Sequence, residues 1–150
     1  MEELAEAAPY LIPMAIVTFW FFMHSMLARF SGWSELADHY RAYDSFEGDK
    51  RHLQSVNIGL GDWMNVNFNN CITIGADARS LHLSVLFILR PFHPPLTIPL
   101  EDIAAEPGET LIFKTVRLRP GRTPGVRIII PRSQAIWVEQ RSERRIVSAI

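Results

Sequence analysis

Four side chains in this sequence have the chemistry of a catalytic site: Cys71, His82, His93 and Asp62. A thiolate with an imidazole as its base, and a carboxylate that orients the base, is a common arrangement for nucleophilic catalysis. However, Cys71 opens an apolar strand, where an inert buried thiol is far more frequent. The histidines have no HxxxH or CxxC companion, and the chain has no glycine-rich phosphate loop or GxSxG elbow. The sequence therefore predicts no catalytic residue, no metal and no cofactor, and an enzyme built on Cys71, His82 and His93 is kept as an alternative.

His24 is the one titratable side chain inside a long apolar segment. An ionisable residue in a membrane span is by default a candidate ligand of a metal, haem or pigment, or a proton relay. Because no second ligand is visible nearby, we expect its ring to lie near the membrane interface and to hydrogen-bond to backbone or water. Trp20, His24, Arg29 and Trp33 are accordingly predicted to mark the anchor and its interface with water.

The apolar segment covers residues 9–28, PYLIPMAIVTFWFFMHSMLA, and carries no formal charge. In an α-helix these twenty residues rise about 30 Å, which matches the hydrocarbon core of a bilayer. A signal peptide is disfavoured because the preceding residues are acidic, and a soluble core helix because apolar side chains cover every face. Pro9 and Pro13 are expected in the first turn, where a missing N–H costs little. We therefore predict a short acidic tail at 1–8, a transmembrane helix at 9–28 and a domain at 29–150.

The basic residues predict the orientation of this anchor. All fifteen Lys and Arg follow the span, and Arg29 abuts its end. The positive-inside rule then places the domain in the cytoplasm and the N-terminus outside, as in a single-pass protein of the inner (cytoplasmic) membrane. A single cysteine agrees, because one thiol cannot form an internal disulfide. The predicted partners are bilayer lipid and, through the helix, another membrane protein; no nucleic-acid partner is predicted.

Residues 31–43, SGWSELADHYRAY, are predicted to form a short amphipathic juxtamembrane helix. Ser31 or Ser34 can cap it. Its apolar face consists of Trp33, Leu36, Ala37 and Tyr40, at helical spacing. Trp33 suits the aromatic belt of a membrane interface, but the same face could equally pack on the sheet of the domain, and both interpretations remain open.

From His52 onward the pattern changes to short strand-like runs separated by turn residues. The expected strands are 53–58, 63–68, 71–74, 81–89, 97–99, 111–118 and 126–130. Asn69-Asn70 is expected to form a tight turn, because Asn tolerates positive φ. The 81–89 strand is expected to be central, with Val85 and Phe87 buried, because the far end of its second face is also apolar. A helix is predicted at 133–145.

About seven strands followed by a helix predict a small α+β domain, mainly an antiparallel β barrel or sandwich with a C-terminal helix. The segments LHLSV at 81–85 and IPLEDI at 98–103 resemble the central hairpin of PH-like domains of the GRAM type. SGWSELADHY, FEG, NNCITIG and RPFHPPLTIP are similar to segments of uncharacterised bacterial proteins, and together these segments cover most of 31–103. The resemblance implies a PH-like fold and a binding or scaffolding module rather than an enzyme.

The chain departs from the PH pattern at one informative loop. PH domains that bind phosphoinositides carry basic residues in the loop joining their first two strands. Here this loop reads Gly59-Leu60-Gly61-Asp62, and Lys50 and Arg51 precede the strand without reproducing the pocket. The resemblance therefore implies no specific inositide site at that loop.

Residues 114–145 contain nine basic and two acidic side chains. Arg117 and Arg119 share one face of the expected 111–118 strand and its extension, and Arg122 continues that face into the next loop. We expect these three arginines to face anionic headgroups or an acidic partner, with a plain solvated face as the alternative.

The function predicted from all these features is a membrane-anchored, non-enzymatic interaction or scaffold domain at the cytoplasmic membrane surface. The alternatives are an accessory subunit of a larger membrane complex and the membrane-surface enzyme named above.

Overall fold

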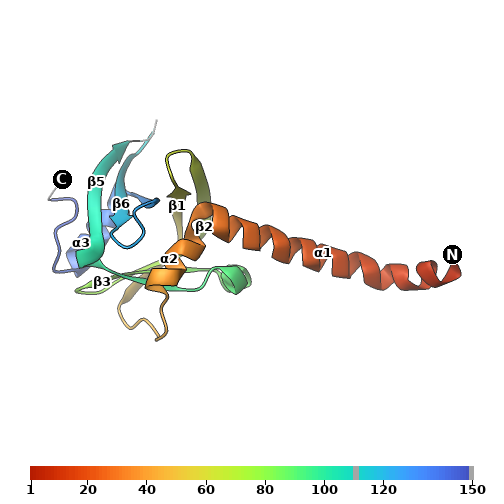
Figure 1. Ribbon diagram of the computed structural model, residues 1–150. Coiled ribbons are helices and arrows are strands. Elements are labelled where there is room, and N and C mark those ends of the chain that lie inside the picture. The colour runs from red at the N-terminus through yellow and green to blue at the C-terminus, as the bar shows by residue number, and fades with distance from the viewer. Residues whose placement is uncertain (110–111, 149–150) are drawn as a thin grey trace.

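A long helix projects from a small β-rich domain, with the N-terminus at its far end (Figure 1). The computed structural model describes residues 1–109 and 112–148, apart from the side chain of Leu4. Helix α1 (Glu2–Ser31) is followed directly by α2 (Trp33–Tyr40). Gly32 separates the two helices with φ 87°, a left-handed conformation that ends α1 and that glycine adopts without a Cβ penalty.

Helix α1 begins earlier than the sequence predicts. It starts at Glu2, so Pro9 and Pro13 lie inside the helix rather than in its first turn. Each proline removes one intrahelical hydrogen bond and crowds the carbonyl group four residues earlier, yet the helix continues through both. The acidic tail is therefore helical as well.

The domain is built on a seven-stranded antiparallel sheet with the order β4-β3-β2-β1-β7-β6-β5. The strands are β1 (Asp49–Leu60), β2 (Met64–Ala76), β3 (Ser80–Val85), β4 (Leu96–Pro99), β5 (Ile103–Glu109), β6 (Lys114–Pro120) and β7 (Val126–Pro131). Two 3₁₀ segments, η1 (Phe87–Phe92) and η2 (Leu100–Asp102), flank β4, and α3 (Arg132–Arg141) follows β7. The sheet curls, and α3 lies on the side of the domain away from α1 (Figure 1). The predicted fold class is confirmed.

Beyond shifts of a few residues at strand ends, such as β1 beginning at Asp49 rather than 53, three differences from the prediction are larger. First, β2 runs without interruption through Asn69-Asn70, and the positive φ of Asn70 (51°) serves a register shift against β1 instead of a turn. Second, β3 ends at Val85 rather than at residue 89. Third, β5 was not predicted, and it pairs with β6, whose expected first residue, 111, lies outside the described residues.

The core lies between the sheet and the helices that cover it. Leu81, Leu83 and Val85 alternate into it from β3, as expected. Helix α2 contributes Trp33, Leu36 and Tyr40, and α3 contributes Ala135, Trp137 and Val138. Both helices are shorter than predicted, because α2 ends at Tyr40 and α3 at Arg141.

Candidate functional site

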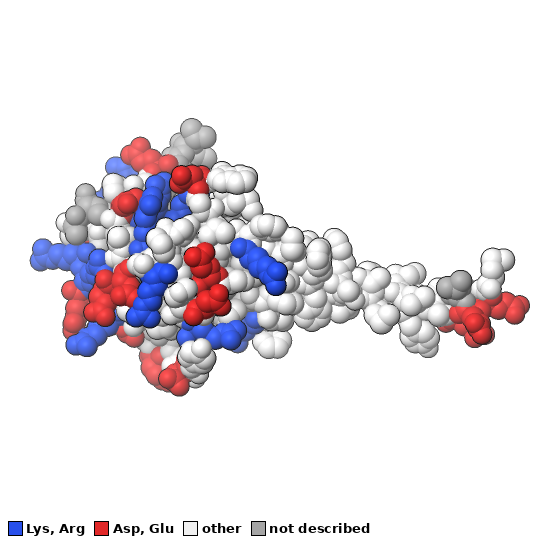
Figure 2. Space-filling model, viewed as in Figure 1, with Lys and Arg blue, Asp and Glu red and all other residues white. Residues whose placement is uncertain are grey.

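Within the described residues, α1 is the one helix that is long and apolar enough to cross a membrane, over Ala5–Ser31. Its large apolar side chains are exposed, including Ile16 at 62% and Phe22 at 62%. A core helix of a soluble protein would bury such side chains, so their exposure favours a surrounding apolar phase. Figure 2 shows α1 as an uncharged rod between the mixed charges of the domain and the acidic N-terminal tip.

The last turns of α1 belong to the core of the domain. His24, Ala28 and Ser31 are buried there, at 8%, 1% and 0% exposure. The ring of Trp20, which is half-buried, lies 4.4 Å from the ring of His24, measured between centroids. We call these four residues the α1 root. Because the root packs on β1, β2 and η1, the projecting helix and the domain are joined without a linker.

His93 packs against the α1 root from the domain side. It is fully buried, with ring centroids of Trp33, Phe68 and His24 at 5.4, 5.6 and 6.3 Å. Its Nδ1 atom lies 3.1 Å from the carbonyl oxygen of Leu89, whereas Nε2 has no hydrogen-bond partner. Burial lowers the pKa of His93 to about 4, the Leu89 hydrogen bond opposes this, and the nearby His24 adds to it. His93 is therefore a neutral structural side chain near pH 7.

The prediction that Trp33 lies at the membrane interface is wrong. Its side chain is 0% exposed, and its indole Nε1–H donates to the carbonyl oxygen of Pro94 at 2.9 Å. This bond joins α2 to the segment between η1 and β4. Of the other predicted interface residues, Trp20 and His24 lie in the root, and Arg29 is exposed in the last turn of α1. The apolar face of α2 packs in the core of the domain. Of the two open interpretations, packing on the sheet is therefore the one that the structure shows.

The η1 segment exposes apolar side chains beside α1. Leu86, Phe87 and Ile88 are 43%, 83% and 63% exposed, and the Phe92 ring lies 5.8 Å from Phe21 of α1. The prediction that Phe87 is buried is therefore wrong. The N–H of Leu86 still donates to the carbonyl oxygen of Cys71 on β2. Beyond Leu86 the chain leaves the sheet, and the N–H of Leu89 donates to the carbonyl oxygen of Leu86.

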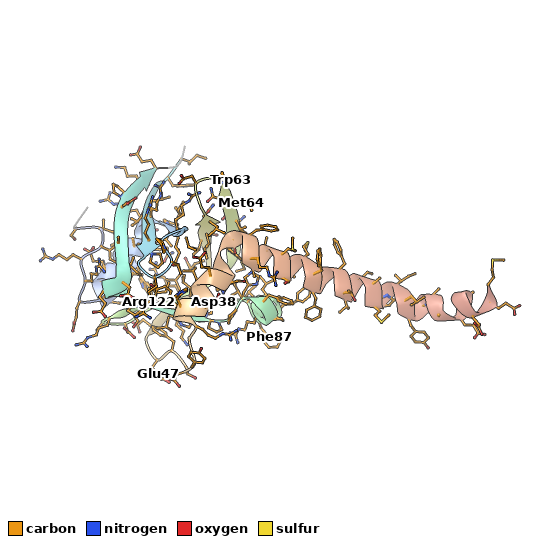
Figure 3. All side chains as sticks on the ribbon, in the orientation of Figure 1. Asp38, Glu47, Trp63, Met64, Phe87 and Arg122 are labelled. Atoms are coloured by element: carbon orange, nitrogen blue, oxygen red, sulfur yellow. The ribbon has the colours of Figure 1, made fainter. Side chains whose placement is uncertain are left out.

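A second exposed aromatic residue, Trp63, lies at the turn between β1 and β2 and is 86% exposed. In Figure 3, Trp63 and Phe87 lie on opposite sides of the place where α1 leaves the domain. The surface around the α1 root thus carries apolar side chains that the domain itself does not cover.

The proposed catalytic group is not assembled. His82 of β3 lies opposite Gly75 of β2. Gly75 is four residues after Cys71, so His82 and Cys71 are separated by about 13 Å along the strand direction. Burial raises the pKa of the Cys71 thiol, so the reactive thiolate is disfavoured. His93 is turned toward α1 and α2. Over residues 1–109 and 112–148, no group of three His, Cys, Asp or Glu side chains is placed to hold a metal.

The three arginines of the predicted basic patch each face a carboxylate. Arg117 and Arg119 lie 3.9 and 3.4 Å from Glu106, and Arg122 lies 3.2 Å from Asp102. Glu106 was missed because β5 was not predicted, and Asp102 lies just before that strand, in η2. On the face shown in Figure 2, basic and acidic groups are interspersed rather than separated. The pairing weakens the positive field of the patch, and contact with an anionic surface stays a prediction.

No protein-family model, no curated protein sequence and no solved structure matches this chain. The resemblance to PH-like domains stays a prediction.

Proposed function

We propose that this chain is a membrane-anchored, non-enzymatic interaction domain held against the membrane surface. The observation that carries the proposal is the α1 root: an exposed apolar helix continues, with no linker, into the buried core at His24, Ala28 and Ser31. A cleavable signal segment would not supply core residues. Removal of α1 would open cavities around Trp33 and His93.

The length of α1 supports contact between the domain and the bilayer. Residues 9–23 of the apolar segment precede His24, its first buried residue. They rise about 22 Å, which is less than the ~30 Å hydrocarbon core. Residues 24–28 complete the span, but they pack on the domain. The surface beside them, with Phe87 and Ile88 of η1, then lies at the depth of lipid, where their exposure is favourable.

The orientation in this proposal follows from charge. Arg29 in the last turn of α1 and Arg90 in η1 are exposed beside the root, and the N-terminal end carries Glu2, Glu3 and Glu6. The positive-inside rule then places the domain in the cytoplasm and the protein in the inner (cytoplasmic) membrane. A PH-like binding module, as the resemblance implies, belongs to the same proposal.

Membrane fractionation tests the anchor. We expect the full chain to stay in the membrane pellet after alkaline extraction. The double variant Ile16→Arg, Phe19→Arg should be released, because each arginine near the helix centre costs about 2.5–3.5 kcal/mol of insertion free energy. Ile136→Arg is the matched control, since Ile136 is exposed on α3, away from α1. Release of the unmodified chain by alkali would refute the anchor.

A reporter fused to the C-terminal end tests the orientation. We expect it to show cytoplasmic activity, and reporter activity on the opposite side of the membrane would reverse the proposed topology.

A second candidate function is an accessory subunit of a larger membrane complex. It is favoured by a shallow apolar hollow on exposed α1, lined by Leu11, Met14, Ala15, Thr18, Phe19 and Phe22. A neighbouring helix could occupy such a surface. Extraction in mild detergent distinguishes the two candidates, because a partner in fixed stoichiometry supports the subunit and a free monomer opposes it.

A further inference from the structure

A cleft of about 510 Å³ lies on the outer face of β1, β2 and β3, beneath the segment that joins α2 to β1. Four basic side chains line it, and we call it the basic cleft: Lys50 and His52 of β1, His82 of β3 and Arg90 of η1. The segment at 42–46 forms the opposite wall. Its volume falls in the range of small-molecule sites, about 300–1,000 Å³.

The two cations of the basic cleft, Lys50 and Arg90, differ from five arginines elsewhere on the domain in having no carboxylate partner within residues 1–109 and 112–148. Arg117, Arg119, Arg122, Arg127 and Arg141 each form an ion pair with a carboxylate. Among the described residues, neither Lys50 nor Arg90 has a carboxylate within 4.0 Å, and Asp44, an exposed side chain, is the acid among those lining the cleft. The ammonium and the guanidinium therefore leave a net positive field in the cleft.

His82 lies within this positive field. It is 6% exposed, and its pKa is lowered to about 4, first by burial and then by the charges of Lys50 and Arg90. Both cations line the same cleft as His82 and disfavour its protonation. An anion bound there would relieve their mutual repulsion.

The ring nitrogens of the cleft are held in place. Nδ1 of His52 lies 3.0 Å from the hydroxyl oxygen of Thr73, and Nδ1 of His82 lies 3.4 Å from that of Thr97. The Phe46 ring stacks on His82 with centroids 4.6 Å apart and an interplanar angle of 12°. These contacts hold both imidazoles, and in the tautomer in which Nδ1 accepts from the threonine hydroxyl, the Nε2–H of each ring is left to donate to a ligand.

Lys50 is held at the same site by Phe46, with its Nζ atom 5.9 Å from the centre of that ring. Two cations and two imidazole rings that line one cleft match the charge and the several acceptor oxygens of a phosphate group. We infer that the basic cleft is a binding site for an anionic phosphate group, held by Lys50 and Arg90 with the imidazoles of His52 and His82. The basic cleft lies near the start of β1. The β1–β2 loop, where PH domains bind phosphoinositides, lies at the opposite end of β1.

The phosphate could belong to a phospholipid headgroup or to a soluble molecule. A headgroup is suggested by the rim of the cleft, since Leu86 lines it and is followed by the exposed Phe87 and Ile88 of η1. A lipid could then place its phosphate in the cleft and its acyl chains against η1. This lipid source rests on the proposed membrane anchoring, whereas the soluble source does not.

The full chain in maltoside micelles, which contain no phosphate, allows both sources to be tested. The ring NMR signals of His52 and His82 report on the cleft, and His39, exposed on α2, is the internal reference. One arm adds inorganic phosphate, and the other adds short-chain phosphatidylglycerol, each against sodium chloride at equal ionic strength. We expect saturable shifts of His52 and His82 in at least one arm: with inorganic phosphate for a soluble ligand, or with the lipid alone for a headgroup.

Variants complete the test. Lys50→Gln and Arg90→Gln should each weaken binding about tenfold or more, because each removes a charge-assisted contact. The matched controls Lys114→Gln and Arg132→Gln alter exposed bases that line a separate hollow, and they should bind as the unmodified chain does. No saturable shift in either arm, or equal affinity in all four variants, would overturn the inference. The inorganic phosphate arm needs no membrane, so its result is independent of the fractionation test.

Discussion

Replacement of Trp33 tests whether α2 belongs to the core of the domain or to the membrane interface. Trp33 is 0% exposed and its indole N–H is the donor to Pro94. Truncation of a buried tryptophan to alanine costs about 3–5 kcal/mol. The carbonyl of Pro94, left without its donor, adds about 1 kcal/mol. Trp33→Ala should therefore lower the free energy of unfolding by about 4–6 kcal/mol.

Urea unfolding of the full chain in micelles, followed by circular dichroism, measures this loss. With an m-value of about 2 kcal/mol per molar urea, the midpoint should fall by about 2–3 M. Such a loss is comparable to the whole stability of a small domain, so Trp33→Phe provides a milder variant. It keeps most of the apolar volume and removes the N–H, and we expect a loss of about 1–2 kcal/mol.

Trp63 provides the matched control, because it is the same residue type at 86% exposure. Trp63→Ala should change the unfolding free energy by no more than about 0.5 kcal/mol. Equal midpoints for Trp33→Ala and Trp63→Ala would refute the core position of Trp33. So would a Trp33→Ala protein of unchanged stability that is lost from the membrane fraction.

Three further predictions concern titration and exposure. The pKa values of His82 and His93 are lowered to about 4, so between about pH 6.5 and 4 the unfolded chain binds protons that the folded chain does not. Stability should be full above that window and fall as the pH drops through it, and His93→Gln should flatten the pH dependence of the urea midpoint. The hydroxyl of Ser148 and the backbone N–H groups of 146–148 lower the pKa of Glu139 to about 2, so its contribution is present above about pH 4.5 and is lost toward pH 2. Glu139→Gln should speed hydrogen exchange at 146–148 near pH 7, and unchanged exchange would count against these bonds. Phe87→Asp should leave the unfolding free energy within about 0.5 kcal/mol, because the side chain is 83% exposed; a loss above about 3 kcal/mol would restore the buried position.

Much of the local structure could be predicted because it depends on composition and period. A charge-free apolar segment of this length is expected to form a helix, and α1 contains all of residues 9–28. The alternation of Leu81, Leu83 and Val85 requires one face of a strand to be buried, and all three side chains are buried.

Local propensity could not decide the structure where one backbone conformation is compatible with either a turn or an irregularity within a strand. Asn70 has the positive φ that its side chain tolerates, but the structure uses it in a register shift within β2 rather than in a hairpin turn. Strand β5 carries Ala104, Ala105 and Pro107, which are weak strand formers, and it exists because it pairs along its length with β6.

The candidate sites depend on contacts between residues far apart in the chain. Glu106 lies opposite Arg117 through the pairing of β5 with β6, so the charge of the predicted patch was decided by register. Lys50 of β1 and Arg90 of η1 line the same cleft although they are forty residues apart in the chain, because β1 and β3 both pair with β2 and η1 follows β3. The burial of Trp33 depends on Pro94, sixty-one residues later. Composition and periodicity constrain each segment alone, and which segments meet is decided by the packing free energy of the whole domain.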